Sequence, residues 1–558
     1  MKNINNLLLL FLWMTVSSCN DYLDMSPKDV ISDELEWSDK ELINTNINQL
    51  YGYLGIAGNG GKNITGVEVR LTEECYSDNA EHCAGFFMDI HNVTKGTINS
   101  SYCPIVTAFT FDDIRHVNIA LKRLPETTCL TDNEKKSFIA QCKFFRAYFY
   151  AQKIKNYGGL PILKEPLGLE DETALPRNTM AECYDFILSD LKEAVPNLPV
   201  TWPSGELGRV TRGAALCLKS RVELYAERYE EAIKTCEEAM TLGYDLEEDY
   251  KALFNTRDTY KKSKEALLTI QFRTPERTHQ MELHQNPNRG RQIYGWGAAC
   301  PTQDLVDEYM VVDKDGIARK WDESQTFKEN WPIIGTHAMW LNRDKRFYAT
   351  IVHDSAVIEY PGAKQYIEMT TDPNSYLNKE PVGHCSHTGY LCRKFKYEGS
   401  EAKFVPNGDN PSETHWVLFR YAEVLLNYAE ALIYSGREQE ALAPINIIRK
   451  RAGLPALTTT TNIIENYRRE RRIEFAFELH RYWDMIRWAK KEGNHAIPEF
   501  ARAGRCLWIE PDRHHYQILQ STDTRYQRTF ETPKRYLFPI PFNEIVKNPN
   551  LAQNPGWE

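Results

Sequence analysis

The sequence predicts a mainly α-helical protein, a tetratricopeptide-like helical-repeat scaffold with a long loop-rich insertion that contains a few short strands. Apolar residues recur at helical spacing in residues 107–155, 178–242, 413–452 and 463–490. Two helix pairs inside these blocks carry small residues at repeat spacing. Between the second and third blocks lie about 150 residues rich in Gly, Pro, Asn and Asp.

The chain begins with a predicted export signal. Lys2 supplies a positive start, residues 4–16 are almost continuously apolar, and Ser17 and Ser18 lead into Cys19. This apolar run is too short for a transmembrane helix, which needs about 20 apolar residues. Small residues ending at a Cys resemble a bacterial lipobox, whose Cys becomes the lipidated first residue of the mature protein. The alternative is an ordinary signal peptide with an incidental Cys. We therefore expect a lipid anchor on Cys19 and an otherwise soluble chain.

The first helical block shows its periodicity most clearly in the segment FIAQCKFFRAYFYAQKI. One stripe of this predicted helix carries Phe138, Cys142, Phe145, Phe149 and Gln152. The block stops at the Asn-Tyr-Gly-Gly sequence of residues 156–159, and Pro161 follows soon after. Gly and Pro in these positions are a signal for the end of a helix.

Two helix pairs show a repeat pattern. In AERYEEAIKTCEEAM the patterned positions are Tyr229, Ala232, Cys236 and Ala239. In NYAEALIYSGREQEALAPINIIRKRAG they are Ala429, Gly436, Ala441, Ile445 and Ile448. Small residues let paired helices approach closely, so that successive pairs stack. The two pairs are far apart in sequence and have to meet across the insertion if they are repeats; the alternative is two unrelated helix hairpins.

The region between the two helix pairs lacks a long helical pattern. Segments 265–272 and 347–359 are strand-like instead. We therefore divide the single compact domain into four parts. These are the signal peptide at 1–18, an N-terminal repeat region at 19–260, the loop-rich insertion at 261–412 and a C-terminal helical region at 413–558.

The cysteines fall into two groups. Four lie within helical patterns and are expected to be buried apolar residues: Cys142, Cys183, Cys217 and Cys236. Eight lie in Gly-rich or polar segments: Cys75, Cys83, Cys103, Cys129, Cys300, Cys385, Cys392 and Cys506. Export permits disulfides, and the spacing leaves open whether some of these residues pair.

The charge balance argues against a nucleic-acid partner. The chain has 67 Lys and Arg against 77 Asp and Glu, a net charge of -10, whereas phosphate binding favours a basic protein. One basic run contains Arg468, Arg469, Arg471 and Arg472. Glu residues at 465, 470, 474 and 478 interleave with it, and we interpret the segment as a salt-bridged helix face.

Common catalytic motifs are missing from the sequence. It contains no G-x-S-x-G, H-E-x-x-H, P-loop or dinucleotide-binding G-x-G-x-x-G pattern. We predict that the protein is not an enzyme. A surface glycosidase remains an alternative, because its two carboxylates meet in space rather than in sequence.

Metal sites are predicted only weakly. His384, Cys385, His387 and Cys392 are zinc-ligand types without a common zinc spacing. The Asp-Lys-Asp-Gly sequence of residues 313–316 resembles the start of a calcium loop, but Ser324 stands where the bidentate Glu belongs. We predict a plain turn at 313–316. No cofactor is predicted, and a bound calcium ion is left open.

Aromatic residues in the insertion are the main candidates for ligand binding. Four of the twelve Trp residues fall between positions 296 and 340: Trp296, Trp321, Trp331 and Trp340. Trp and Tyr faces bind the C–H patches of sugar rings at little conformational cost. Tyr294 lies beside the first of them. Some of these rings can instead form a local core, and we expect at least two to be structural and at least one to be partly exposed.

Many segments, taken in order, resemble the SusD/RagB family of outer-membrane nutrient-uptake lipoproteins. The resemblance covers nearly the whole mature chain, and no single motif is decisive. It is carried by CNDYLDMSP, RNTMAECYDFILSDLKEAVPNLP, GRVTRGAALCLKSRVELYAERYEEA, LNRDKRFYATI, TGYLCRKF, ERRIEFAFELHRYWDMIRW and YLFPIPFNEIVKNPNLAQNPGW, and by the two repeat segments.

The resemblance implies a fold, a location and partners. It implies four tetratricopeptide-like repeats with an inserted ligand-binding region. It also implies a lipoprotein on the outer face of the outer membrane that binds oligosaccharides without hydrolysing them and caps a TonB-dependent, SusC-like transporter. Tyr76 and Asp78 are added as weaker ligand-binding candidates, because their loop region lies near the site in the family. A peptide- or protein-binding adaptor on the same fold is the alternative function.

Overall fold

The computed structural model describes most of the mature chain. The described residues are 32–55, 70–83, 88–105, 109–168, 170–286, 295–360, 363–377, 385–398, 412–493 and 496–558. The predicted export signal and the lipidation site Cys19 lie outside them. Within the described ranges, no helix combines the length and apolar character needed to cross a bilayer.

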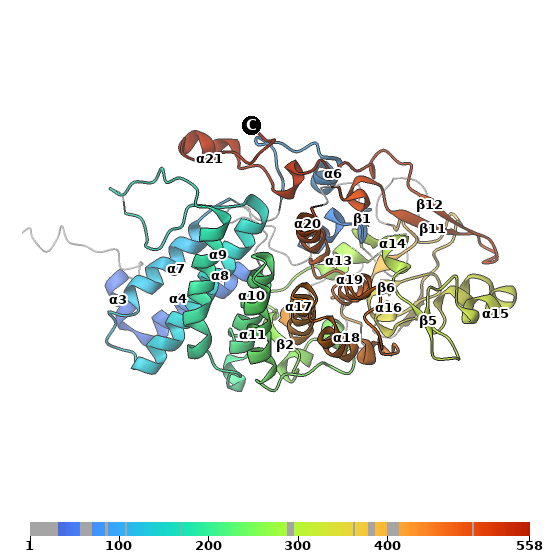
Figure 1. Cartoon of the computed structure of the whole chain (residues 1–558), viewed down its shortest axis with the longest axis horizontal. Helices are drawn as coiled ribbons and strands as arrows, with labels where there is room; N and C mark the ends of the chain where they lie inside the picture. The colour runs from blue at the N-terminus through green and yellow to red at the C-terminus, as the bar shows by residue number, and fades with distance from the viewer. Residues whose placement is uncertain are drawn as a thin grey trace, which may run out of the picture.

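The N-terminal helices pack side by side at one end of the molecule, drawn in blue to green in Figure 1. They are α3 (Asp33–Ser38), α4 (Lys40–Gly52), α7 (Asp112–Arg123), α8 (Asp132–Tyr157) and α9 (Met180–Ala194). Helix α8 contacts α4, α7 and α9. Between α4 and α7 lie the short elements η1 (Tyr53–Gly55), η2 (Thr72–Tyr76), β1 (Ala80–His82) and α6 (Met88–Lys95).

Local sequence signals explain where the longest helix begins and ends. At the start of α8, Thr131 and Glu134 form a capping box, in which each side chain accepts a hydrogen bond from the other's backbone N–H. At its end, Gly158 has a φ of 79°, a conformation that favours glycine. The predicted stop at residues 156–159 is therefore confirmed.

The two predicted repeat pairs are neighbours in space. They are α10 (Arg212–Tyr225) with α11 (Tyr229–Met240), and α17 (Tyr421–Tyr434) with α18 (Glu438–Ala452). Helix α17 packs against both α10 and α11 across the insertion. Ala232, Ala429 and Ala441 are fully buried at these contacts. The prediction that the pairs meet across the insertion is confirmed.

A two-stranded sheet joins the two halves of the chain. Strand β2 (Ala266–Ile270) pairs antiparallel with β10 (Trp416–Arg420), and β10 runs directly into α17. The strand prediction at 265–272 is confirmed. The prediction that a helix begins at 413 is wrong for residues 416–420, because their backbone groups pair with β2 instead of with each other.

The insertion forms short helices and two-stranded sheets at the other end of the molecule (Figure 1). The short elements α12 (Ala252–Asn255) and η5 (Thr259–Lys261) lead into it. Its own helical elements are α13 (Met281–Gln285), α14 (Gln303–Val306), α15 (Gln325–Ile334), η6 (Gly335–Trp340) and α16 (Lys345–Thr350). Its strands are β3 (Ala299–Pro301), β4 (Val311–Val312), β5 (Ala318–Arg319), β6 (Ile351–Val352), β7 (Val357–Tyr360), β8 (Ala363–Tyr366) and β9 (Leu391–Cys392). Antiparallel pairs form between β1 and β3, β4 and β5, β6 and β9, and β7 and β8.

Two expectations for the insertion are tested locally. The turn predicted at 313–316 is confirmed, since it connects β4 to β5 and Gly316 has a φ of 77°. The strand predicted at 347–359 is only partly right, because residues 345–350 form α16. Asp344 caps that helix by accepting a hydrogen bond from the backbone N–H of Arg346, at 2.9 Å.

The C-terminal region completes the core. It contains α19 (Ile463–Glu474), α20 (Arg481–Lys491), η7 (Pro498–Ala501), β11 (Arg505–Ile509), β12 (Tyr516–Gln520), η8 (Lys534–Tyr536) and α21 (Phe542–Lys547). Two short elements of the N-terminal half, η3 (Val195–Asn197) and η4 (Ser204–Glu206), lie between α9 and α10. The single helix predicted at 463–490 is broken at residues 475–480. Phe477 and Leu479 there have φ values of 64° and 66°, which a helix cannot contain.

One hydrophobic core runs through both helical regions and into the insertion, reaching from Trp37 to Trp557. The four helical cysteines are buried within it, as predicted. The four helical cysteines are free thiols in the described structure, and so are Cys75, Cys83, Cys103, Cys129, Cys300, Cys392 and Cys506.

Candidate functional site

Two of the predicted tryptophans meet in one aromatic cluster at the end of the insertion. Trp321 is buried, and its Nε1 donates to Asp307 Oδ1 at 2.8 Å. Its ring lies edge-on to Phe327, with 4.9 Å between centroids. Trp331, on α15, is half-buried, with its ring 5.4 Å from Phe327 and 5.1 Å from Tyr516 of β12. The cluster therefore has a buried base and a partly exposed ring.

Trp340 belongs to the interior. Its ring is stacked on His353 at 4.6 Å and on Phe347 at 5.9 Å, and the side chain is 6% exposed. The interplanar angles are 28° and 12°, so both contacts cover ring faces. The expectation that at least two of the four tryptophans are structural is met by Trp340 and Trp321.

Trp296 lies apart from these rings, beside α13. Its backbone N–H donates to the carbonyl of Leu283 at 2.8 Å, and its ring centroid is 4.5 Å from that of His284. The side chain is half-buried. Tyr294, the predicted neighbour, lies outside the described residues. Trp296 and Trp331 thus fulfil the expectation of a partly exposed ring, but they stand on different elements.

Tyr76 and Asp78 are brought together with the arginine run of α19 and α20 rather than with the tryptophans. Tyr76 is 5% exposed and lies edge-on to Tyr482. Asp78 accepts hydrogen bonds from Arg472 at 2.8 Å and from Arg481 at 2.9 Å. Burial alone would raise the pKa of Asp78, but the charges of the two guanidinium groups hold it well below its ordinary value.

The basic run on α19 is salt-bridged, as predicted, but it is not a solvated helix face. Most of its partners come from other elements: Arg471 binds Asp484 at 2.6 Å, and Arg472 binds Asp78 and Glu308. Only Arg469 contacts a Glu one turn away, Glu465 at 3.5 Å. Helical spacing located the charges correctly, whereas their burial depends on the segments that pack over α19.

Two surface recesses were not indicated by any sequence motif. One has a volume of about 290 Å³ and is lined by Tyr51, Arg209, Gln271 and Arg277 among others. The second, of about 390 Å³, lies over the arginine run. Both present hydrogen-bonding side chains that suit hydroxyl groups. The first recess joins residues from three distant segments, which a local pattern had no means of bringing together. The second is lined almost entirely by residues 462–481, with Glu308 as the one distant contributor.

The candidate zinc and calcium residues do not form a metal site in the described structure. No group of three or more His, Cys, Asp or Glu side chains there is arranged to hold an ion. His384 lies outside the described residues. Asp313 accepts hydrogen bonds from the backbone N–H groups of Gln325 and Thr326, at 3.0 and 2.8 Å, so it caps α15.

Two family models match this chain. The one described as the SusD family matches residues 254–557, and the one described as starch-binding associating with outer membrane matches residues 21–224.

Solved structures and curated proteins are similar over nearly the full length. A SusD-like protein from Bacteroides fragilis is 31% identical, with a TM-score of 0.79 over 95% of this chain and 100% of that one. A SusD-like carbohydrate-binding protein from the same species is 23% identical, with a TM-score of 0.76 over 93% and 100% of the two chains. SusD-like protein P2 of Formosa agariphila is 24% identical over 98% of both chains.

Proposed function

The chain belongs to the SusD family, and from that premise we propose that it captures oligosaccharides or polysaccharides at the cell surface and delivers them to a SusC-like, TonB-dependent outer-membrane transporter. Proteins of this family bind glycans and are not catalytic. The family description also associates them with the outer membrane. The proposal adds, for this chain, the glycan site, the lipid anchor on Cys19 and the transporter partner.

The half-buried ring of Trp331 is the observation that supports glycan binding most directly. Phe327 and Tyr516 hold this ring in place from two sides, so little side-chain entropy remains to be lost when a sugar stacks on it. Trp296 offers a second partly exposed ring on the α13 side. The binding roles of both, and of Tyr294, Trp321, Trp340, Tyr76 and Asp78, remain predictions.

The buried candidates already make structural contacts in this conformation. Trp321 and Trp340 pack into the core, and Asp78 is neutralised by two arginines. A sugar reaching them would have to displace these contacts. We therefore propose Trp331 and Trp296 as two separate stacking positions and treat the other five residues as supporting or alternative positions.

A glycan array followed by calorimetry tests this proposal. The oligosaccharide bound most tightly on the array is titrated into wild type and into Trp331→Ala and Trp296→Ala. Loss of a stacking ring at a hot spot costs about 2 kcal/mol or more, which is roughly a thirtyfold or larger loss of affinity. Thermal stability should change little in the variant that loses binding, because the ring is partly exposed.

Three further variants serve as controls. Trp202→Ala removes a half-buried Trp of the helical scaffold and should leave affinity unchanged. Trp321→Ala and Trp340→Ala should each cost about 3–5 kcal/mol of stability, as for buried aromatic residues generally. Unchanged affinity in both Trp331→Ala and Trp296→Ala would place the glycan site elsewhere. Binding of peptides but of no glycan would instead favour the adaptor function.

A further inference from the structure

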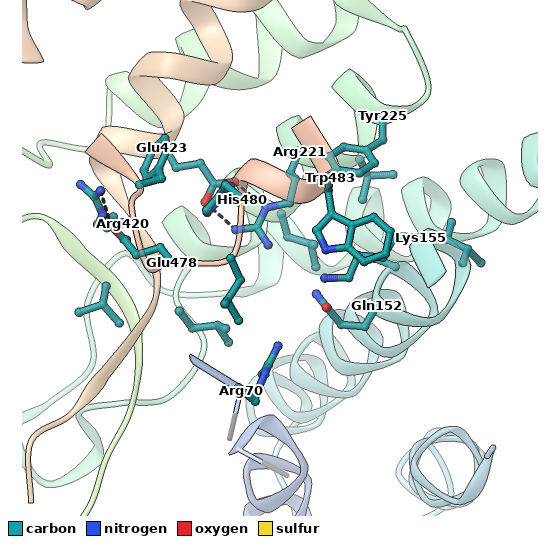
Figure 2. Close-up of a pocket in the computed structure, with 18 of the residues that line it drawn as sticks. Arg70, Gln152, Lys155, Arg221, Tyr225, Arg420, Glu423, Glu478, His480 and Trp483 are labelled. Atoms are coloured by element: carbon teal, nitrogen blue, oxygen red, sulfur yellow. Dashed lines mark hydrogen bonds and ion pairs between the residues drawn. The ribbon is translucent and has the colours of Figure 1, made fainter. Parts of the chain in front are cut away.

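A partly open cavity lies where the N-terminal helices meet the C-terminal region (Figure 2). None of the aromatic candidates of the insertion is among its lining residues. Its volume is about 70 Å³. Helices α8, α9 and α10 form one wall, and β10, α17 and the broken segment between α19 and α20 form the other. The volume is large enough to hold several water molecules.

Two of the four cations that line the cavity already have carboxylate partners. Arg221 donates to both oxygens of Glu423, at 2.5 and 2.6 Å. Arg420 donates to Glu478 at 2.6 Å. These contacts neutralise both carboxylates of the cavity wall.

The other two cations, Lys155 and Arg70, are not neutralised. Within the described part of the chain neither forms an ion pair, and Arg70 donates to the carbonyl of Leu54 at 3.1 Å. The charge of Glu73 raises the pKa of both Lys155 and Arg70, but Glu73 forms an ion pair with neither in the described part of the chain. Burial raises the pKa of Glu73, and the charges of Arg70 and Lys155 offset only part of this effect.

His480 supplies no further charge to the cavity. Its ring stacks on Phe475 at 4.5 Å. Burial first, and then the charges of Arg221, Arg471 and other cations, hold the pKa of His480 well below its ordinary value, so the imidazole is neutral. The uncompensated positive charge of the cavity is therefore located on Arg70 and on the protonated form of Lys155.

Lys155 is in an unfavourable environment when the cavity holds only water. Burial, with smaller contributions from Arg70 and Arg221, lowers the pKa of Lys155 to about 7. The ammonium lies 5.0 Å from the centroid of the Trp483 ring, a favourable contact that adds to the attraction of the Glu73 charge. An unpaired cation in such a position is expected to attract an anion.

We propose that this cavity is a binding site for a small oxyanion, a carboxylate, sulfate or phosphate group, held by Lys155 and Arg70. The guanidinium of Arg70 matches two oxygens of such a group, and Lys155 contributes a point charge. Gln152 faces the same space and adds an amide donor. The volume suits a group of a few heavy atoms rather than a whole sugar chain, so this site is separate from the proposed glycan surface.

Binding here would join the two halves of the molecule. Lys155 belongs to α8 and Arg70 precedes η2, whereas Trp483, Glu478 and His480 come from the C-terminal region. A ligand that binds the folded state alone stabilises it in a saturable way. Thermal unfolding with added anion therefore reports the proposed site without any glycan.

The test uses the mature chain with sulfate, phosphate, acetate and glucuronate, each at constant ionic strength. Wild type should show a saturable rise in Tm, and calorimetry should detect binding of at least one of these anions. Lys155→Met should bind that anion at least tenfold more weakly. Lys136→Met, an exposed residue of the same helix, should behave like wild type and thereby corrects for the general salting effect of sulfate.

Comparing the four anions shows which kind of anion the cavity prefers. Stronger binding of glucuronate than of acetate would identify the acidic group of a sugar, and stronger binding of sulfate or phosphate a free inorganic ion. If Lys155→Met does not fold, Arg70→Gln replaces it, with the same expected loss. A Tm that rises equally in wild type, Lys155→Met and Lys136→Met, without calorimetric binding, would overturn the proposal while leaving the glycan function untouched.

Discussion

A network of buried ion pairs lies at the end of α19. Glu474 is fully buried and accepts hydrogen bonds from Arg346 at 3.0 Å, from Arg420 at 2.5 Å, and from Arg451. Burial alone would raise the pKa of Glu474, but the charges of Arg451, Arg420 and Arg346 hold it well below its ordinary value. Each charge is stable there only because its partners are in place.

We expect Glu474→Gln to be strongly destabilising. Removing one partner of a buried ion pair leaves an uncompensated charge, at a cost of about 3–5 kcal/mol. Glu440→Gln is the matched control, because Glu440 pairs with Arg437 on the surface and such pairs contribute about 1 kcal/mol or less. Urea unfolding of both variants measures the difference. Equal stabilities for the two variants would show that the buried network contributes nothing specific.

A second buried carboxylate predicts how stability depends on pH. Glu430 of α17 accepts hydrogen bonds from Arg487 at 2.9 Å, Tyr467 at 2.6 Å and the Nε1 of Trp488 at 2.9 Å. Burial raises the pKa of this carboxyl, but the charge of Arg487 outweighs that effect and brings it to about 2. The folded state thus favours the ionised form more than the unfolded state does.

The sign of the effect follows from this lowered pKa. The stabilisation by Glu430 is fully present above its ordinary pKa of 4.5 and is lost as the pH falls from there toward 2. Its size is roughly 3 kcal/mol. We expect Glu430→Gln to be less stable than wild type at pH 7 and to lose less stability on acidification. Parallel stability curves for the two proteins between pH 5 and pH 2 would contradict this assignment.

At the scale of elements, small residues decide how the repeat helices pack. Ala441 of α18 is fully buried, whereas Ala443 on the same helix is exposed. The helix pair α17–α18 and the contact of α17 with α11 both depend on close approach. The repeat pattern in the sequence correctly predicted small residues at these helix contacts, because the pattern depends only on spacing along a single helix.

Ala441→Leu should therefore destabilise the protein by about 1–3 kcal/mol, the usual cost of extra methylene groups in a packed core. Ala443→Leu places the same side chain in solvent and should be within about 0.5 kcal/mol of wild type. Chemical unfolding with the same probe compares the two. A destabilised Ala443→Leu or a neutral Ala441→Leu would refute the proposed packing role.

Elements whose form depends on distant partners were predicted less well. Residues 416–420 continue the helical pattern of α17 but pair with β2 instead. The break at 475–480 also depends on a distant contact, because the N–H of Leu479 donates to Glu74 at 3.1 Å. Neither partner is visible in the local sequence. The prediction from helical spacing therefore started α17 too early and treated α19 and α20 as one helix.

At the scale of the whole molecule, the lipid anchor on Cys19 is a prediction that can be tested directly. The described helices include none suited to crossing a bilayer, and Cys19 is the predicted acylation site. We expect Cys19→Ala to move the protein from the membrane to the soluble fraction, since stable anchoring requires acyl chains. Fractionation in a strain that lacks the proposed partner transporter measures this directly. Membrane retention of the variant in that strain would rule out the lipid anchor.

The helical class, the repeat pairs, the end of α8 and the family could all be predicted from the sequence. These depend on residues within a few turns of one another or on the order of many segments along the chain. It also singled out the insertion as rich in Trp, but it had no means of telling Trp331, which is partly exposed, from Trp321 and Trp340, which lie in the core. Burial is a property of everything that surrounds a side chain, and here α15, β12 and η6 decide it.

Only the tertiary structure decided which charges are buried and which cavities exist. Lys155 and Arg70 lie 85 positions apart in the sequence and share a cavity because α8, η2 and the segment after α19 converge. Asp78 reaches Arg472 and Arg481 in the same way. Electrostatic energies depend on distance and on the exclusion of water, and both are set by packing between distant segments rather than by neighbouring residues.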